Sequence, residues 1–411
     1  MLKTYRYRLY PNAAQATLLA QHFGHVRYVY NWALRFKKKY YSLYGKTLSR
    51  RSLQDRLVKR KRMDKYQWLS EVNSQSLLCA LYHLDDAYKN FLAGRAKFPR
   101  FKTRKSNWQS FQCPQHVSVD QENGWINLPK IKSIKAIIHR GFTGQIKTCT
   151  IKKNPSGHYY ISILVEDNMP LPIVATITEQ KAIGVDVGLK EFVITSEGKK
   201  YDNQRYLQQS LSALNRSQRQ LSRKQKGSAN RSKQRLVVAK RHDKITKQRN
   251  FYHHHVANQL LGDNQVATVA VEDLHIKGMI RNRKLSRHIA DVAWSRFLDI
   301  VSYKAKWQGK HVIHCGRYQP SSKQCSCGVI NDGLTLKHRE WDCLSCGQHH
   351  DRDILAANNI KKFAIADALG QSVCVKQFPH SDRSSKSTMA KDQDSQILMG
   401  RKKPPLEQLA V

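Results

Sequence analysis

Three acidic positions stand at the ends of apolar segments, where a carboxylate is costly to bury. Asp186 lies in IGVDVGLKEFVITSEG, Glu272 lies near the end of ATVAVEDL, and Asp353 follows Asp351 in HHDRDILAANNI. A carboxylate in apolar surroundings must be paired, capped or bound to a metal. Carboxylates that converge from distant parts of a chain are the ligands with which a pair of Mg²⁺ ions cuts a phosphodiester. The acids therefore predict a nuclease.

Each acid also has a competing structural interpretation. Asp186 is flanked by glycines and could cap a turn. Strand alternation turns only one of Glu272 and Asp273 toward a given face, and the sequence does not choose between them. Asp351 could cap the helix that Asp353 starts. Each acid alone is a weak signal, but three acidic positions in one order within one domain strongly favour a metal site, with both choices between neighbouring acids left open.

Four of the nine cysteines form a second constellation. Cys325 and Cys327 form a C-x-C pair, Cys343 and Cys346 form a C-x-x-C pair, and a glycine follows each pair. Paired thiolates at such a separation are typical of a structural zinc ribbon, so we expect one Zn²⁺ held by all four sulfurs. The short first pair makes tetrahedral geometry harder. Other possible ligands are His314, Cys315 and His338.

The net positive charge of the chain indicates what kind of partner it binds. The 411 residues include 72 Lys plus Arg against 30 Asp plus Glu, a formal net charge of +42. Such an excess implies a polyanionic partner and salt-dependent binding. Ribosomal and histone-like proteins are equally basic, but they are usually short and lack acids at strand ends. The sequence has no secretion signal and no apolar run long enough to span a bilayer, which predicts a cytoplasmic protein with reduced thiols and no membrane partner.

The elements expected in the first 170 residues are a strand, several basic helices and then further strands. A strand is predicted over 2–10, helical spacing over 13–41 and 53–92 with an interruption near 64–71, and a hairpin turn at Asn154-Pro155-Ser156-Gly157. This order predicts a small β-barrel formed by 1–10 and 113–172, with a helical insert over 11–112. A proline-containing linker follows near residue 170.

Beyond residue 181, strands alternate with helices. Strands are predicted over 183–187, 192–195, 266–272 and 310–315, and helices over 286–307 and 354–368. With acids at the strand ends, this order fits an α/β RNase H-like domain over 181–316 and 351–376, interrupted by a zinc ribbon over 317–350. The polar residues 377–411 predict a disordered tail.

A strongly basic helical region runs from 203 to 261 and is broken near Gly227 and Ser228 into a helical hairpin. Such a hairpin could be a solvated coiled coil. The excess of one sign of charge favours an arm that faces nucleic acid. Four residues represent this arm and are called the hairpin cations below. They are Arg219, Arg223, Lys233 and Arg235.

Several motifs in fixed order make the chain resemble the TnpB family, transposon-encoded RNA-guided nucleases related to type V CRISPR effectors. The resemblance covers roughly residues 1–365 and rests on YRYRLYPNAAQ, FGHVRYVYNWAL, FPRFK, LPKI and NPSGHYYISILVE. It continues with GVDVGLKEF, QRNFYHHH, VEDL, RYQPSSKQCSCG and WDCLSCGQHHDRD. Leu355 departs from the family, which usually has Asn at that position.

The resemblance implies specific roles. Asp186, Glu272 and Asp353 would be a RuvC-type triad for two catalytic Mg²⁺ ions, and the four cysteines would hold the zinc of the inserted ribbon. The N-terminal recognition helices and wedge-like barrel would bind a guide RNA derived from the transposon end and read a short motif beside the double-stranded DNA target. We therefore expect an RNA-guided DNA endonuclease of the prokaryotic cytosol or nucleoid.

Two other functions remain as alternatives. A relative that no longer cuts would be an RNA-guided DNA-binding protein, although the intact triad argues against it. A transposase that joins transposon ends would also use an acidic triad. Cleavage of a plasmid with a guide-matched target distinguishes the nuclease from the binding protein, and guide-independent cleavage would indicate the transposase.

Overall fold

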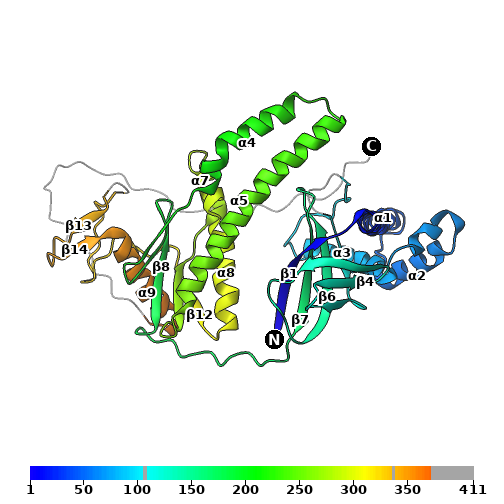
Figure 1. Ribbon diagram of the computed structural model, residues 1–411. Helices are drawn as coiled ribbons and strands as arrows, with labels where there is room; N and C mark the ends of the chain where they lie inside the picture. The colour runs from blue at the N-terminus through cyan, green and yellow to red at the C-terminus, as the bar shows by residue number, and fades with distance from the viewer. Residues whose placement is uncertain (105–108, 336–337, 372–411) are drawn as a thin grey trace, which may run out of the picture.

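The computed structural model describes residues 1–104, 109–335 and 338–371. Two sheets with their helices form two bodies, which are joined by the segment that follows residue 166 (Figure 1). The first body contains the N-terminus, and the second carries both the predicted acids and the cysteines. The tail predicted over 377–411 lies outside the described residues.

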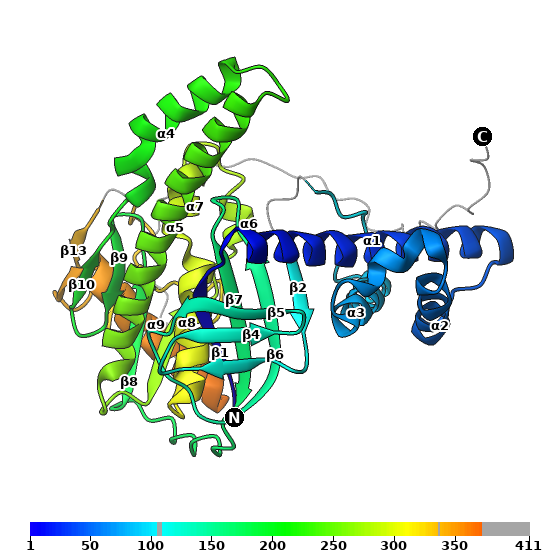
Figure 2. The same ribbon diagram turned by 45° about the vertical axis from the view of Figure 1, so that its right-hand side comes forward.

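The first body contains a seven-stranded antiparallel sheet in the order β2-β6-β7-β1-β5-β4-β3. Its strands are β1 (Leu2–Tyr10), β2 (Gln109–Cys113), β3 (Ser118–Asp120), β4 (Trp125–Leu128), β5 (Ile131–Ile137), β6 (Gln145–Lys153) and β7 (Tyr159–Glu166). Alternate residues of β7 are buried, as expected for a strand with one face on a core. The sheet is strongly curled, with β2 and β3 at its edges (Figure 2).

Helices extend from this sheet. They are α1 (Ala13–Tyr44), α2 (Arg50–Lys61), the 3₁₀ helix η1 (Asp64–Ser70) and α3 (Ser74–Leu92). Asn12 begins α1 with a capping box shared with Gln15, and Gly45 ends it in a left-handed conformation. Helix α1 reaches away from the sheet (Figure 2). Residues from Gln109 onward pair with β6 as strand β2, so the sheet resumes shortly before the boundary expected at residue 113.

The second body contains a five-stranded sheet in the order β10-β9-β8-β11-β12. Its strands are β8 (Ala182–Val187), β9 (Glu191–Thr195), β10 (Lys200–Asp202), β11 (Thr268–Glu272) and β12 (His311–Cys315). Strands β8, β11 and β12 are parallel, whereas β9 and β10 pair antiparallel. The four predicted strands are present, and β10 is an addition that extends the edge.

Helices cover both faces of this sheet. They are α4 (Tyr206–Arg223), α5 (Ala229–Gly262), the short α6 (Ile276–Met279), α7 (Ser286–Val292), α8 (Trp294–Trp307) and α9 (Arg352–Leu369). Val269 and Val271 of β11 share one core with α5, α7 and α8, and Ala270 between them packs on α9. The single helix predicted over 286–307 is wrong: Ala293 adopts a left-handed backbone with φ 54° and separates α7 from α8.

A small two-stranded unit lies between β12 and α9. Strands β13 (Glu340–Asp342) and β14 (His349–Asp351) pair antiparallel and join directly onto α9. This unit projects from the second body at the N-terminal end of α9 (Figure 1). It contains the predicted zinc-ribbon cysteines.

Candidate active site and metal centre

The register of two neighbouring strands brings Asp186 and Glu272 to the same edge of the sheet. Val185 of β8 is the partner of Val271 on β11, and the strands are parallel. The next residues along the two strands are therefore Asp186 on β8 and Glu272 on β11. Parallel strands end at a common edge, so the two carboxylates come from adjacent carboxyl ends of the sheet.

A close contact of helix α9 with β8 brings Asp353 toward the same edge. A Cβ atom on Gly184 would lie 1.9 Å from the carbonyl oxygen of Ala357, so only glycine lets the two backbones approach this closely. Asp186 lies two residues beyond Gly184 on the strand, and Asp353 lies one helical turn before Ala357. Two residues along the strand and four residues along the helix each span about 6 Å, so both acids lie at a similar distance from the Gly184–Ala357 contact.

Electrostatics link the three acids. Burial and then the charges of Glu272 and Asp353 raise the pKa of Asp186 to about 7. Burial also raises the pKa of Glu272, and neighbouring Asp273 adds to the rise. Each shift reports that an ionised carboxylate is disfavoured at this edge unless a cation accompanies it.

The competing acids at the strand end and helix start have other partners. Asp273 pairs with Arg317 at 2.6 Å and its side chain is half exposed. Asp351 caps α9, accepting hydrogen bonds from the backbone N–H groups of Asp353 and Ile354, and pairs with Lys200 at 2.7 Å. These bonds overcome the effect of burial and lower the pKa of Asp351. Capping thus accounts for Asp351, as its position before the helix suggested.

An arginine that the sequence analysis did not single out contacts the third acid. Arg339, just before β13, donates from Nη1 to both carboxylate oxygens of Asp353 at 3.1 Å. This ion pair connects the cysteine-bearing unit to the start of α9. A single arginine in a strongly basic chain gives no sequence signal for such a contact.

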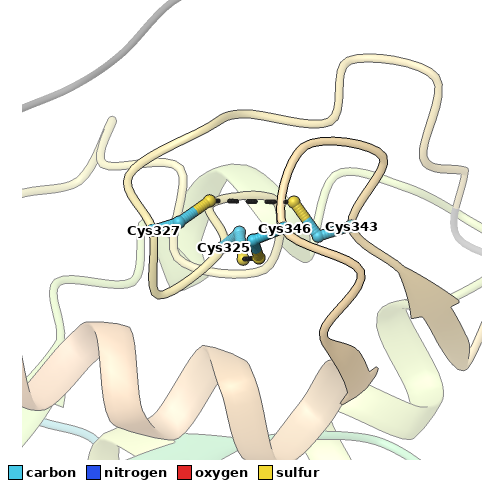
Figure 3. Close-up of side chains that lie close together, drawn as sticks. All are labelled: Cys325, Cys327, Cys343 and Cys346. Carbon is cyan, nitrogen blue, oxygen red and sulfur yellow. Dashed lines mark hydrogen bonds between the residues drawn. The ribbon is translucent and has the colours of Figure 1, made fainter.

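The four predicted cysteines converge (Figure 3). Their sulfur atoms all lie within 4.8 Å of one another. Cys325 Sγ is 3.5 Å from Cys346 Sγ, and Cys327 Sγ is 3.7 Å from Cys343 Sγ. Zinc–sulfur bonds of about 2.3 Å in a tetrahedron separate sulfurs by about 3.8 Å. The cluster therefore fits one zinc ion despite the short C-x-C pair, and the prediction of a four-cysteine cluster is confirmed.

The thiols lie in different electrostatic surroundings. Burial raises the pKa of Cys325 to about 12. Burial acts in the same direction on Cys343, but the backbone N–H groups of Cys346 and Ser345 outweigh it and lower the pKa to about 7. Amides turned toward a sulfur are what a zinc-bound thiolate requires.

Two further side chains border the cluster. Buried His350 places Nε2 3.0 Å from Cys325 Sγ, and its ring packs beside Trp341. Leu355 of α9 belongs to the same buried cluster as Cys325 and Cys343. The residue that departs from the usual family pattern thus packs the helix of Asp353 against the ribbon.

The hairpin cations are exposed on α4 and α5. None of the four forms an ion pair within the part of the chain that the structure describes. Arg235 lines a cavity of about 970 Å³ between the hairpin tip and the first body, a feature called the basic cleft below. Five other cations border this cleft, and no acid does so among the described residues. They are Arg27, Arg104, Lys153, Lys226 and Arg231.

In the described ranges, every helix is too short or too polar to cross a bilayer.

Known proteins match this chain along most of its length. A family model described as "Probable transposase" matches residues 161–283, a "Cas12f1-like, TNB domain" model matches 294–360, and a "Helix-turn-helix domain" model matches 1–46. The cryo-EM structure of a Cas12f1–sgRNA–target DNA complex is similar in fold with a TM-score of 0.54, at 12% identity. The similarity covers 88% of this chain and 98% of that one. The chain thus shares the fold of this Cas12f1 structure, and its cysteine-bearing segment matches the model of a Cas12f1-like domain.

Two relatives specify the family. A Streptomyces pristinaespiralis protein named "Putative RNA-guided DNA endonuclease" is 35% identical over 95% of this chain and 96% of its own. A protein from Escherichia coli K12 named "Putative RNA-guided DNA endonuclease InsQ" is 30% identical over 87% of this chain and 91% of its own. The chain belongs to the TnpB family, together with these two relatives.

Proposed function

We propose that this protein is an RNA-guided DNA endonuclease that cleaves guide-matched double-stranded DNA beside a short adjacent motif. The observation that carries the proposal is the convergence of Asp186, Glu272 and Asp353 on one edge of the five-stranded sheet. Family membership supports the same activity. The guide would derive from the end of the transposon that encodes the protein, in the prokaryotic cytosol.

Divalent magnesium suits the three acids. Carboxylate oxygens are hard ligands, which Mg²⁺ prefers, and the raised pKa of Asp186 indicates that nearby positive charge would stabilise its ionised form. Asp186, Glu272 and Asp353 would hold two such ions. When bound, Mg²⁺ supplies a Lewis acid and lowers the pKa of water at the scissile phosphate.

The chain's own residues prepare this edge for DNA. Strands β8 and β11 fix Asp186 and Glu272 on a rigid sheet, and the Gly184 contact fixes the start of α9. Arg339 holds Asp353 through two hydrogen bonds, so a metal bound there would compete with a guanidinium group. The ribbon thereby acts directly on the third acid.

Zinc would have a structural role. The four cysteines would hold the ion and make the ribbon rigid. The buried cluster that contains Trp341 and Leu355 would then restrain the start of α9. Structural zinc stabilises its domain because metal-binding free energy is also folding free energy. Loss of zinc should therefore loosen the start of α9.

The basic cleft and the hairpin cations would contact the nucleic-acid backbone. Six cations around one cavity, with no acid among its described lining residues, favour a polyanion between the hairpin and the first body. In RNA-guided nucleases, base pairing reads the sequence, and the protein holds the heteroduplex by its shape and charge. The family alternative that binds without cutting would use the same surface.

Neutral variants of the acids test the proposal with matched controls from the same chain. Glu272→Gln should abolish cleavage of a plasmid with a guide-matched target, and Asp273→Asn should retain most of it. Asp353→Asn should likewise be inactive, although it keeps the helix start. All these variants should still bind the target, because metal ligands contribute to the transition state more than to heteroduplex binding. Cleavage by Glu272→Gln, with loss in Asp273→Asn, would refute the assignment.

A further inference from the structure

A second cavity lies beside the basic cleft, on one face of α1. It has a volume of about 380 Å³, within the range of about 300–1,000 Å³ that small-molecule pockets occupy. Tyr28, Trp32 and Arg35 line it from α1, and Arg60 lines it from α2. Arg27 also lines it and borders the basic cleft, so the two cavities share a wall.

Arg60 is held in place by aromatic side chains. Its Nε and Nη2 donate to the Tyr28 hydroxyl oxygen at 3.1 and 2.8 Å. Its guanidinium carbon lies 3.7 Å from the centroid of the Tyr66 ring and 5.4 Å from that of Trp32. A planar cation fixed between rings loses little rotamer freedom when it binds an anion.

The cavity carries three guanidinium groups and no carboxylate among the described residues that line it. Arg60 could serve only to pack α2 against η1 through Tyr66. Packing does not explain why Arg27 and Arg35 share the same cavity with it, since like charges repel. Cations without acid partners beside a flat indole ring suit a ligand with both a phosphate and an aromatic base.

We propose that this cavity binds one unpaired nucleotide of the nucleic acid that occupies the basic cleft. The base would stack on Trp32, and Arg27, Arg35 and Arg60 would contact its phosphate. The proposal rests on the proposed nucleic-acid-binding function and adds a place where one base leaves the duplex. A paired base has no access to such a pocket, so single strands should depend on it and duplexes should not.

Oligonucleotide binding to the RNA-free full-length protein tests this. The probes are fluorescein-labelled 12-mers of uridylate, of thymidylate and of a DNA duplex, measured by anisotropy. Arg60→Ala and Trp32→Leu should each weaken binding of at least one single strand about tenfold, the size expected for loss of one base stack. Duplex affinity should stay within about twofold. A larger effect on uridylate assigns the nucleotide to RNA, and a larger effect on thymidylate assigns it to DNA.

Arg56→Ala is the matched control. Arg56 also lies on α2 and over an aromatic ring, at 4.8 Å from the centroid of Phe36, but it does not line the cavity. The Arg56→Ala substitution removes the same charge as Arg60→Ala and should change single-strand affinity no more than about twofold. Arg60→Lys keeps the charge without the planar group, so it should resemble Arg60→Ala and guards against a folding defect.

The proposal is overturned if Arg60→Lys and Trp32→Leu bind both single strands as Arg56→Ala does, or if duplex affinity falls equally. Failure of the proposed nuclease function looks different. In that case the acid variants and the wild type would leave a guide-matched plasmid equally intact, while these binding differences persist.

Discussion

Replacing Gly184 by alanine should separate cutting from binding. The added Cβ would lie 1.9 Å from the carbonyl oxygen of Ala357, whereas ordinary contact begins at 3.4 Å. Strand β8 is in the middle of the sheet, between β9 and β11, so it has little room to yield. Helix α9 must therefore move by roughly 1.5 Å, and it carries Asp353 with it.

The expected magnitude follows from that displacement. Overpacking of this kind costs about 1–3 kcal/mol of stability. A misplacement of about 1 Å in a catalytic group can slow chemistry about a hundredfold. In the proposed function, guided DNA binding relies on the basic cleft, which neither Gly184 nor Ala357 lines, so binding should change little.

Single-turnover plasmid cleavage and filter binding of the same complex measure the two effects. Gly262→Ala is the control, because its Cβ meets nothing within 4 Å at the end of α5. It should cut like the wild type. Wild-type cleavage by Gly184→Ala, with an unchanged Tm, would refute the reasoning that α9 is fixed through this contact.

Three further predictions concern metal, charge and pH. Zinc should co-purify at about one ion per chain, and Cys343→Ser should lower zinc content and Tm together. Cys79→Ser, at a buried cysteine outside the cluster, should leave zinc content unchanged. A zinc-free wild type that folds normally would contradict this prediction. Reversing all four hairpin cations to Glu should weaken RNA and duplex binding and flatten their salt dependence in filter assays, and unchanged slopes would indicate a solvated hairpin. Burial lowers the pKa of His253 to about 4, so the unfolded chain gains its proton first and stability falls as pH drops from about 6.5 toward 4. His253→Leu should show a shallower loss of Tm over that range, and parallel Tm curves would contradict this.

Much of the second body followed from periodicity and residue type. The strands at 183–187 and 310–315 carry β-branched Ile and Val residues, and the helical hairpin breaks at 224–228, around Gly227 and Ser228. The break at Ala293 could not be predicted, because alanine favours helix and its residue type gives no signal for a left-handed φ. Short strands such as β10 depend on a neighbouring edge and have too few residues to show a period.

The candidate site divides in the same way. Cysteine spacing was sufficient to predict the cluster around Cys325 and Cys343, because ligand geometry constrains sequence. The sequence left Asp351 and Asp353 as competitors, and their different partners depend on Lys200 and Arg339, which lie far apart along the chain. The nucleotide cavity was missed because Trp32 and Arg60 meet only when α2 packs against α1. The roles of the three acids in cutting remain predictions.

The most direct measurement of the central claim uses the protein purified with its own RNA. That RNA is sequenced, and plasmids with a matched or a scrambled target are incubated with the complex and Mg²⁺. The wild type should linearise only the matched plasmid, and Asp186→Asn should bind it without cutting. Cutting that ignores the match, or cutting that survives Asp186→Asn, would contradict an RNA-guided nuclease with its centre at this edge of the sheet.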